Sequence, residues 1–470
     1  MSDNSTNDQV HIVILAAGKG TRMRSALPKV LHRLAGLPLL DHVLRTASSV
    51  KPASVTVVVG HEGDRIRGFL GQYPKIKTVV QEPQLGTAHA LLQAEAVLAG
   101  QSGTLVLLSG DVPFLSGATL RALLDTHRSS QSAATVVTAT LDRPYGYGRI
   151  VRIGGEVARI VEERDASPAE RDIKEINSGI YAFDLAQLFE ALRTIGAKNA
   201  QGEYYLPDLV AIYRRQHRPV ATWTVADAGE IRGINSRSEL AEVGRMVRQQ
   251  KNEELMASGV TLVDPATTYV DVDVEVGPDT LIHPGVHLEG STKIGAACEI
   301  HAGVRLVNAT VGDRVTILNH CLVVDSIVGA GCHVGPFAHL RPDSVLGEGA
   351  KVGNFVELKK ATLGAGAKAS HLSYLGDATI GEGANIGAGT ISCNYDGTRK
   401  HQTTIGKGAF VGSNSTLVAP VTIGDHAYVA AGSAITADVP PGALAVARSR
   451  QENKQGWVAK RKATEPPRSK

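Results

Sequence analysis

An apolar residue recurs at every sixth position between Val270 and Ile435. Nineteen such positions fall into three unbroken runs, and each one holds valine, isoleucine or leucine. The runs are Val270, Val276, Ile282, Leu288, Ile294, Ile300 and Leu306; then Val328, Val334, Leu340, Leu346, Val352 and Leu358; then Ile405, Val411, Leu417, Ile423, Val429 and Ile435. Neither an α-helix nor a β-strand has a period of six, so the pattern predicts a repeat architecture.

The hexad predicts a parallel β-helix. A small residue often follows the apolar one, as in Ile294-Gly295. Each hexad would form a short strand and a corner, and three hexads would form one triangular coil with branched aliphatic side chains stacked inside. The register slips by one near Leu306–Val311, at Ser326 and near Leu358–Leu363, and it breaks at Ser392–Ile405. We expect bulges or loops that leave the prism at these points.

The first half alternates apolar strand-like runs with amphipathic segments, which predicts a doubly wound, mostly parallel α/β sheet. Ligands in such sheets bind beyond the carboxyl ends of the strands. The expected strands are Val10–Leu15, Val55–Val59, Thr78–Val80, Leu105–Leu108, Ala134–Thr138, Ile180–Phe183 and Ala221–Val225. The expected helices include Asp41–Ser48, Ala88–Leu98 and Ala118–His127.

A helix is predicted over Ser238–Ser258, because apolar residues recur there at helical spacing among charges and Gly259 follows. We interpret it as a spacer between the two architectures. The predicted organisation is an α/β domain over residues 1–236, a helical linker over 237–258, a β-helix domain over 259–447 and a basic tail over 448–470.

The charge distribution argues against nucleic-acid binding. The chain of 470 residues has a net charge of +3, and the segment Arg448–Lys470 holds eight basic and two acidic residues, so the remainder is slightly acidic. This tail is either a solvated end or places Arg448 against a phosphorylated ligand. The four cysteines lack CxxC spacing, Met1–Gln9 lacks the features of a signal peptide, and no apolar run is long enough to span a membrane. We therefore expect a cytoplasmic protein.

The first strand leads into the segment Leu15–Met23, which is followed by Pro28-Lys29. Glycines here would let backbone amides approach a polyphosphate, while Arg22 and Lys29 would neutralise its charge. A G-x-G after a strand also occurs in simple turns. The whole segment from Ala16 to Lys29, however, resembles the signature loop of sugar-phosphate nucleotidyltransferases.

Further candidates follow the next strands. Gln81 and the segment Gln84–Ala88 could contact a base edge. Asp111 follows a buried strand, where a carboxylate beside a triphosphate is a natural Mg²⁺ ligand, and Asn235 could supply a second oxygen. A turn or helix-capping role for Asp111 remains the alternative.

Taken together, these motifs closely resemble the bifunctional bacterial family that joins an N-acetylglucosamine-1-phosphate uridylyltransferase to a glucosamine-1-phosphate acetyltransferase. The resemblance covers about Val10 to Trp457. It implies a UTP and UDP-sugar site at Leu15, Ala16, Ala17, Gly18, Lys29, Gln81, Gly86, Thr87, Ser109, Gly110 and Asp111, amino-sugar contacts at Gly148, Glu162 and Asn177, and Mg²⁺ ligands at Asp111 and Asn235. One departure is Ser109, where the family leads us to expect tyrosine.

The uridylyl reaction requires little acid–base chemistry from side chains. A sugar 1-phosphate is already anionic near neutral pH, so it can attack the α-phosphorus of UTP directly while pyrophosphate leaves. Catalysis is then positioning and charge neutralisation, which we assign to Lys29, Arg22 and Mg²⁺.

The predicted prism also carries candidate reactive groups. Arg341 and Lys359 are cations suited to a sugar phosphate, and His371 and Tyr374 lie within one hexad. The register break releases the polar loop Cys393–Lys400. A structural or surface role remains the alternative for each of these groups.

The family resemblance assigns roles to these residues. His371 matches the general base, for which an imidazole has a suitable pKa. The amino-sugar phosphate would contact Arg341, Lys359, Tyr374, Asn385, Asn394 and Tyr395. Acetyl-coenzyme A would contact Ala388, Ser413, Ala431 and Arg448. The resemblance also implies a left-handed β-helix and a homotrimer with active sites between neighbouring prisms.

The expected function is therefore synthesis of UDP-N-acetylglucosamine, a precursor of peptidoglycan and lipopolysaccharide. Acetyl transfer from acetyl-coenzyme A to glucosamine 1-phosphate would precede uridylyl transfer from UTP. One alternative is a nucleotidyltransferase whose β-helix is only a trimerisation or regulatory scaffold. A second is a non-catalytic regulatory subunit, which the intact phosphate loop with Lys29 and Asp111 disfavours.

Overall fold

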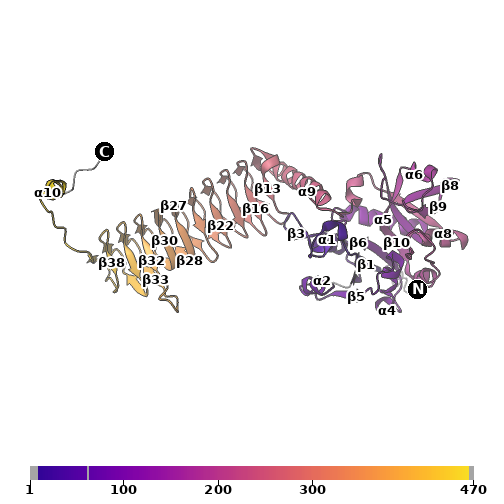
Figure 1. The fold of residues 1–470 in the computed structure, drawn as a ribbon, viewed down its shortest axis with the longest axis horizontal. Coiled ribbons are helices and arrows are strands. Elements are labelled where there is room, and N and C mark those ends of the chain that lie inside the picture. Colours follow the sequence, from indigo (N-terminus) through magenta and orange to yellow (C-terminus); the bar gives the residue numbers. More distant parts are fainter. Residues whose placement is uncertain (1–8, 61–62, 465–470) are drawn as a thin grey trace, which may run out of the picture. The chain divides into compact units, whose positions relative to one another are not determined.

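The computed structural model describes residues 9–60 and 63–464, which form two compact units divided between Val247 and Arg248 (Figure 1). Most of the N-terminal segment Met1–Gln9, and the last six residues of the predicted tail, lie outside the described residues. Within the described ranges, no helix is both long and apolar enough to cross a membrane.

The first unit is built on a mixed sheet with the strand order β11-β7-β10-β6-β1-β4-β5. Strands β6, β1, β4 and β5 are mutually parallel, whereas β10 runs antiparallel to both β6 and β7. The strands are β1 (Val10–Ala16), β4 (Ser54–Val59), β5 (Ile76–Val80), β6 (Thr104–Ser109), β7 (Ala134–Thr140), β8 (Arg149–Ile153), β9 (Glu156–Val161), β10 (Glu175–Asp184) and β11 (Val220–Thr224), with a small separate pair β2 (Arg33–Leu34) and β3 (Leu37–Pro38).

Helices cover both faces of this sheet, as Figure 1 shows. Alternate residues of β1 accordingly enter different cores: Val13 packs on one side, and Ile12 and Ile14 pack on the other. The helices are α1 (Leu39–Ser48), α2 (Gly63–Leu70), α3 (Thr87–Leu92), α4 (Glu95–Leu98), α5 (Gly117–Ser130), α6 (Pro168–Arg171), α7 (Leu188–Leu192) and α8 (Asp208–Arg215). The predicted α/β fold class is confirmed.

Two local features of this unit differ from the sequence prediction. The helix expected over Ala88–Leu98 is divided into α3 and α4 around Gln93 and Ala94. The antiparallel hairpin β8–β9 was not predicted. Its turn is Gly154-Gly155, and both residues have positive φ, as the tight turns of two-residue hairpins require.

The second unit is the predicted prism of hexapeptide coils (Figure 1). One face is an 11-stranded parallel sheet, and the other two faces together form a 17-stranded sheet. The strands are β12 (Thr261–Leu262), β13 (Tyr269–Val270), β14 (Glu275–Val276), β15 (Leu281–Ile282), β16 (His287–Glu289), β17 (Lys293–Ile294), β18 (Glu299–Ile300), β19 (Arg305–Val307), β20 (Thr310–Val311), β21 (Thr316–Ile317), β22 (Leu322–Val324), β23 (Ile327–Val328), β24 (His333–Val334), β25 (His339–Leu340), β26 (Val345–Leu346), β27 (Lys351–Asn354), β28 (Glu357–Leu363), β29 (Lys368–His371), β30 (Tyr374–Ile380), β31 (Asn385–Ile386), β32 (Ile391–Cys393), β33 (Thr403–Ile405), β34 (Phe410–Val411), β35 (Thr416–Val418), β36 (Val421–Ile423), β37 (Tyr428–Val429), β38 (Ala434–Ile435) and β39 (Leu444–Ala445).

The hexad positions fill the inside of the prism. All of them are buried except Val276, which packs partly buried against the same core. The parallel β-helix predicted from the hexads is therefore confirmed. Since each coil pairs in parallel with the next, residues 17 or 18 positions apart become vertical neighbours, as in the pairs His287–Arg305 and Lys293–Thr310.

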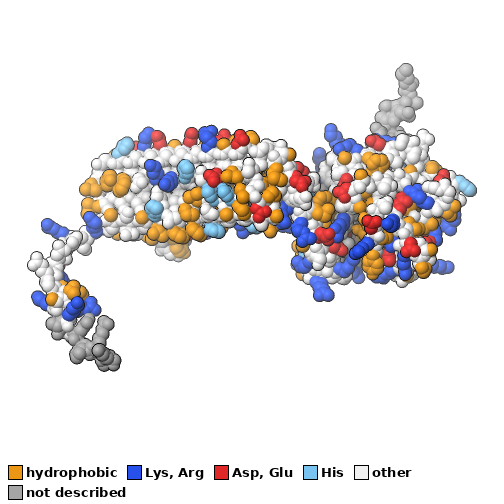
Figure 2. All heavy atoms as spheres, turned by 90° about the horizontal axis from the view of Figure 1, so that it is seen from above, with side chains coloured by type: hydrophobic (Ala, Val, Ile, Leu, Met, Phe, Trp, Pro, Cys, Tyr) orange, Lys and Arg blue, Asp and Glu red, His pale blue; other side chains and the backbone are white. Residues whose placement is uncertain are grey.

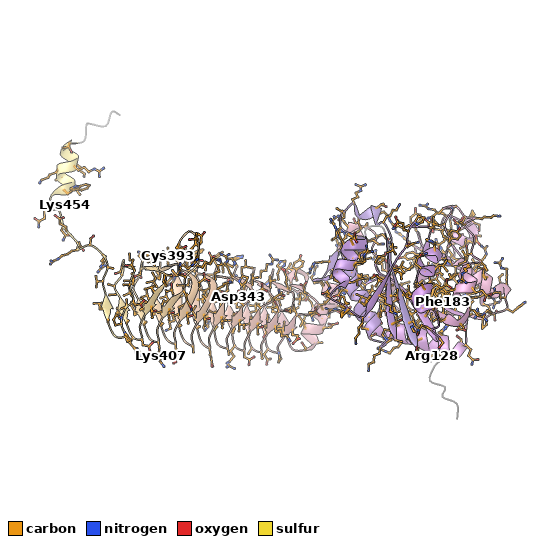
Figure 3. The ribbon with its side chains drawn as sticks, turned by 90° about the horizontal axis from the view of Figure 1, so that it is seen from below. Arg128, Phe183, Asp343, Cys393, Lys407 and Lys454 are labelled. Carbon is orange, nitrogen blue, oxygen red and sulfur yellow. The ribbon has the colours of Figure 1, made fainter. Side chains whose placement is uncertain are left out.

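The register slips do not all have the predicted consequence. At Leu306–Val311 and Leu358–Leu363 a corner is shorter by one residue, and no loop leaves the prism; the second slip lies within the continuous strand β28. Only the break at Ser392–Ile405 inserts extra chain, so that Ile380 pairs with Ile405 across 25 positions. Figure 3 shows this segment projecting from the prism beside Cys393.

The predicted linker helix is α9 (Arg237–Ala257). Val243, in its first half, packs in a small core with Leu34 and Ile234 of the first unit. In its second half, Leu255 joins the prism core, and the Asn252 side chain donates hydrogen bonds to Pro265 O and Thr268 O at 2.8 and 3.0 Å. A short helix, α10 (Trp457–Thr464), ends the described chain.

Candidate functional sites

A cavity of about 460 Å³ lies in the first unit at the carboxyl ends of β1 and β6. This is the edge where open α/β sheets bind their ligands. The residues around it include the following members of the predicted nucleotide site: Leu15, Ala16, Ala17, Gly18, Lys29, Gln81, Gly86, Thr87, Ser109 and Asp111. Gly110 supports the wall, because its N–H donates to Leu15 O at 2.9 Å and joins the two strand ends.

Two glycines shape the loops around this cavity. Gly20 has a φ of 58°, and a Cβ there would lie 2.9 Å from the Lys29 Cβ. Gly86 precedes α3 with a φ of 110°, and a Cβ there would lie 2.7 Å from Tyr204 O. Only glycine permits such approaches. The Gln81 side chain donates to Gly86 O at 3.0 Å and thereby holds the second loop.

The two predicted metal ligands converge on one cationic group. The Lys29 ammonium donates to Asp111 Oδ2 and, at 3.0 Å, to Asn235 Oδ1. A carboxylate oxygen and an amide oxygen therefore both contact the positively charged Lys29 ammonium. Hard oxygen donors of this kind are the protein ligands that Mg²⁺ takes, with water and phosphate oxygens completing its shell. The donor set thus fits a divalent ion.

Backbone contacts hold this pair of oxygens in place. Ile234 N donates to Asp111 O at 2.9 Å, and Asn235 N donates to Glu239 Oε2 at 2.6 Å. Glu239 lies in the first turn of α9 and also accepts from Ser236 N. Ser109, at the position where tyrosine was expected, donates through its hydroxyl to Asp111 Oδ1 at 2.7 Å. The small side chain therefore orients the carboxylate.

A second, larger cavity of about 790 Å³ adjoins the first and shares Ser109 and Asp111 with it. Arg22 lines this second cavity, together with Tyr147 and Arg232. Arg22 therefore lines the second cavity, whereas Lys29 lines the first.

The three predicted amino-sugar residues lie close together: Gly148 directly precedes β8, Glu162 directly follows β9, and Asn177 lies on β10. Gly148 O accepts from Asn177 N at 2.9 Å, and a Cβ on Gly148 would lie 3.1 Å from Glu162 Oε1. Burial raises the pKa of Glu162, and the negative charges of Asp165 and Asp208 raise it further. Partly buried polar groups of this kind are suited to fixing the hydroxyl and amide groups of a sugar.

On the prism, His371 lies in a vertical column of corner residues. Its backbone pairs with Asn354 in the coil before, and its Nδ1 lies 2.5 Å from Asn354 Oδ1. The register of β29, β31, β34 and β37 continues this column through Ala388, Ser413 and Ala431. The imidazole therefore lies one coil from the first of the predicted acetyl-coenzyme A residues, and Gly389 N donates to His371 O at 3.3 Å.

Small side chains continue the column towards Arg448. A Cβ on Gly387 would lie 2.5 Å from Ser413 N, and one on Gly412 would lie 2.5 Å from Ala431 N, so the coils touch along this edge. A Cβ on Gly432 would lie 4.0 Å from Arg448 Cδ. The structure thus places Ala388, Ser413 and Ala431 in one column, and Arg448 lies beside the end of it at Gly432.

A group of cations lies on an adjacent face of the prism. Arg341, Lys359 and Gly376 occupy successive coils in one column. Arg341 donates to Glu357 Oε1 at 2.8 Å. A hydrogen bond from Lys400, and its positive charge, lower the pKa of Lys359. Two ammonium groups held this close are suited to an anionic ligand between them.

The inserted loop meets this group through Lys400, and its other predicted site residues differ in burial. Asn394 is buried and donates to Asp377, and a Cβ on Gly376 would lie 2.4 Å from the Tyr374 hydroxyl and 2.8 Å from Asn394 Nδ2. Tyr374 and Asn394 are therefore neighbours. Tyr395, by contrast, is 61% exposed and donates to Gly397 O at 2.5 Å within its own loop. Asn385 lies on β31, in register with Lys368 and Phe410.

Three residues of these sites were missed by sequence reasoning. Asn354 and Glu357 bind His371 and Arg341, and Glu239 holds Asn235. Counting back one coil from His371 would have identified Asn354, because the two residues are 17 positions apart in the repeat.

Comparisons with known families agree with both units. Residues 12–238 match the MobA-like NTP transferase domain. Residues 267–364 match the GMPPB C-terminal domain, and residues 402–437 match the bacterial transferase hexapeptide (six repeats).

Relatives match nearly the whole chain. The bifunctional protein GlmU of Pelobacter propionicus is 48% identical over 451 residues, covering 96% of this chain and 98% of that protein. The GlmU proteins of Trichlorobacter lovleyi and Streptococcus thermophilus are 50% and 47% identical, each with 96% of this chain and 98% of the relative covered. The chain therefore belongs to the family of bifunctional GlmU proteins and is an enzyme with a uridylyltransferase activity and an acetyltransferase activity.

Proposed function

We propose that uridylyl transfer from UTP to N-acetylglucosamine 1-phosphate takes place at the two adjoining cavities of the first unit. The base and ribose would occupy the first cavity, near Gln81 and Gly86. The sugar would lie towards Gly148, Glu162 and Asn177. Asp111 lines both cavities, which supports its assignment to the reacting phosphates between them.

The side chains here position charge rather than transfer protons. The sugar phosphate oxygen attacks the α-phosphorus, and the bond to pyrophosphate breaks. Lys29 and Arg22 would neutralise the negative charge that develops on the phosphate oxygens. Gly18 would let the backbone approach the triphosphate closely, since it has no side chain to fill that space.

A divalent metal fits this site, and we propose Mg²⁺. Asp111 Oδ2 and Asn235 Oδ1 would hold it, because both already contact the Lys29 ammonium. When bound, Mg²⁺ supplies charge neutralisation and orientation of the phosphate oxygens. Glu239 would keep Asn235 in place through the backbone contact at 2.6 Å.

We propose that acetyl transfer from acetyl-coenzyme A to glucosamine 1-phosphate takes place on the prism beside His371. Its imidazole would remove the proton from the attacking amine, and Asn354 would fix the orientation of the ring. The backbone N–H of Ala388, one coil away, would donate to the thioester oxygen as negative charge develops there. Arg341 and Lys359 would bind the sugar phosphate, with Tyr374, Asn385, Asn394 and Tyr395 completing that site.

The observation that carries this assignment is the common column of His371 and Ala388. A β-helix that served only as a scaffold would have no need to place an oriented imidazole beside a line of small residues that ends at Arg448. Incubation of the pure protein with glucosamine 1-phosphate, acetyl-coenzyme A, UTP and Mg²⁺ tests the proposal. Mass spectrometry should detect free coenzyme A, N-acetylglucosamine 1-phosphate and UDP-N-acetylglucosamine. UDP-sugar formed only when N-acetylglucosamine 1-phosphate is supplied would favour the scaffold.

We propose a homotrimer in which neighbouring prisms share this site. Beside the His371 column runs a ladder of exposed apolar side chains, Phe337, Phe355 and Leu372, which are 48%, 56% and 61% exposed. Exposed apolar surface of this kind marks an interface. A neighbouring prism on the ladder would lie next to His371. The cysteines are free thiols, which agrees with a reducing compartment, and we propose the cytoplasm.

A further inference from the structure

Two histidines and a glutamate converge on one face of the prism, in the coils that follow α9. Histidine side chains gather along the prism (Figure 2). His283 and His301 follow β15 and β18 in consecutive coils, and their rings stack with centroids 4.7 Å apart and planes 12° apart. That spacing equals the distance between paired strands. The β-helix therefore holds both imidazoles parallel and pointing the same way.

Glu299 links the two rings. Its Oε1 lies 3.2 Å from His283 Nε2 and 3.3 Å from His301 Nε2. A tetrahedral Zn²⁺ with bonds of about 2.0–2.1 Å has ligand atoms roughly 3.3–3.4 Å apart, which is close to both separations. The three ligand atoms lie within 4.8 Å of one another, and within the described part of the chain no other group of three such residues is this close.

We propose that His283, Glu299 and His301 bind one transition-metal ion of the Zn²⁺ type. Two imidazoles and one carboxylate favour Zn²⁺ over Mg²⁺, which takes oxygen ligands. The site is distinct from both reaction sites: β18 is four strands from β29, the strand of His371, or about 19 Å along the prism. With three protein ligands, the fourth position is open to water. The ion would tie two consecutive coils together.

The ligands are accessible to an ion from solution. The side chains of His283, Glu299 and His301 are 28%, 43% and 24% exposed. Binding would require the two Nε2 atoms to be unprotonated, with Glu299 ionised. The competing interpretation is a hydrogen-bonded His–Glu–His group with no affinity for metal. The Glu299→Gln variant distinguishes the two interpretations. Its amide oxygen still accepts a hydrogen bond from an imidazole N–H, but it carries no charge to bind a metal ion.

The test is a Co²⁺ and Zn²⁺ titration of the full-length protein after removal of metal with a chelator. Excess Mg²⁺ is kept present to occupy the oxygen site at Asp111. We expect one equivalent of Co²⁺ per chain with the intense visible absorption of tetrahedral coordination, displaced by one equivalent of Zn²⁺. Glu299→Gln and His301→Ala should weaken Zn²⁺ binding by at least about 10–100-fold, the loss caused even by changes outside the ligand shell. Zn²⁺ should raise the melting temperature of the wild type but not of these two variants.

His287→Ala is the matched control. His287 also stacks on a ring of the preceding coil, Tyr269, at 4.6 Å, and its Nδ1 lies 4.0 Å from an oxygen of Glu289, but among the described residues it belongs to no group of three potential ligands. This variant should bind Zn²⁺ as the wild type does. The proposal is overturned if the wild type shows no tetrahedral Co²⁺ spectrum, or if Glu299→Gln and His301→Ala retain the wild-type stoichiometry and affinity.

Discussion

His371 and Asn354 face each other across one coil of the prism, with His371 Nδ1 2.5 Å from Asn354 Oδ1. An amide oxygen accepts a hydrogen bond and cannot donate one, so this contact places the proton of a neutral imidazole on Nδ1. Nε2 then carries the free lone pair. Asn354, 17 positions earlier in the chain, thus leaves Nε2 as the ring nitrogen that can accept a proton from an amine.

Replacing His371 by alanine should lower the rate of acetyl transfer by roughly 10²–10⁴-fold, the usual contribution of a general base. Asn354→Ala should cause a smaller loss, because the imidazole remains but its tautomer and orientation are no longer fixed. Release of the coenzyme A thiol measures both effects. His426→Ala removes another exposed prism imidazole and serves as the control. An unchanged rate in His371→Ala would remove this residue from catalysis.

Asp111→Ala should abolish pyrophosphate release, with a loss of at least about 10²–10³-fold, since it removes the proposed metal ligand and the partner of Lys29. Acetyl transfer should be unaffected, because the residues proposed for it all lie in the other unit. The two products are measured in parallel on one preparation. Asp125→Ala, an exposed carboxylate on α5, is the control. Equal loss of both activities would contradict separate sites.

Lys359→Ala should raise KM for glucosamine 1-phosphate by roughly 10–100-fold, which corresponds to the loss of one charge-assisted hydrogen bond. The kcat should change little, because the phosphate is bound in both ground state and transition state. Steady-state kinetics at varied sugar phosphate separate the two parameters. A fall in kcat with KM unchanged would place Lys359 in the chemical step instead.

Acid should weaken the first unit through His127. This histidine is buried on α5 with its Nδ1 3.0 Å from Thr135 Oγ1, and burial, helped by Arg128, lowers its pKa from 6.5 to about 4 against an opposing effect of Asp184. Between about pH 6.5 and 4, His127 is protonated in the unfolded chain but not in the folded chain. The free energy of unfolding should therefore fall between about pH 6.5 and 4, by up to about 3 kcal/mol.

His127→Gln should flatten this dependence, because glutamine can still bind Thr135 but does not titrate. Urea unfolding followed by the fluorescence of Trp223, in a Trp457→Phe background, reports on the first unit. His217→Gln, an exposed histidine of the same unit, should leave the pH dependence unchanged. If His127→Gln follows the wild-type curve, another group is responsible.

Light scattering should give three times the chain mass of 49.4 kDa. Phe355→Asp places a charge on the exposed ladder and should shift the protein towards monomer, with acetyl transfer falling in proportion while uridylyl transfer persists. A monomer that retains full acetyl transfer would refute a shared site.

The hexad rhythm was sufficient to predict the prism because its period is unlike that of any single helix or strand, and the residues it identified are the ones inside. Prediction from the sequence was weaker for the bounds of short helices and strands in the first unit. The hairpin β8–β9 was missed although Gly154-Gly155 is a turn signal, and α3 is divided from α4 at Gln93-Ala94, where the sequence has neither glycine nor proline.

Side-chain partners were the least predictable part of the sites. Asn354 and Glu239 carry no motif of their own. Each matters because the fold places it beside His371 or Asn235, and contacts between coils become visible only once the register is known.

Because each coil pairs with the next, the number of residues between two positions determines how far apart they lie along the prism axis. Eighteen residues inserted between His301 and Asn354 at a coil boundary would move the whole His371 column by about 4.8 Å along the prism and leave its internal neighbours unchanged. Six residues would instead keep the hexads in register but turn the following chain by one third of a coil, which moves the whole column onto another face of the prism. The prism can therefore be lengthened only by whole coils if the column is to stay on the same face.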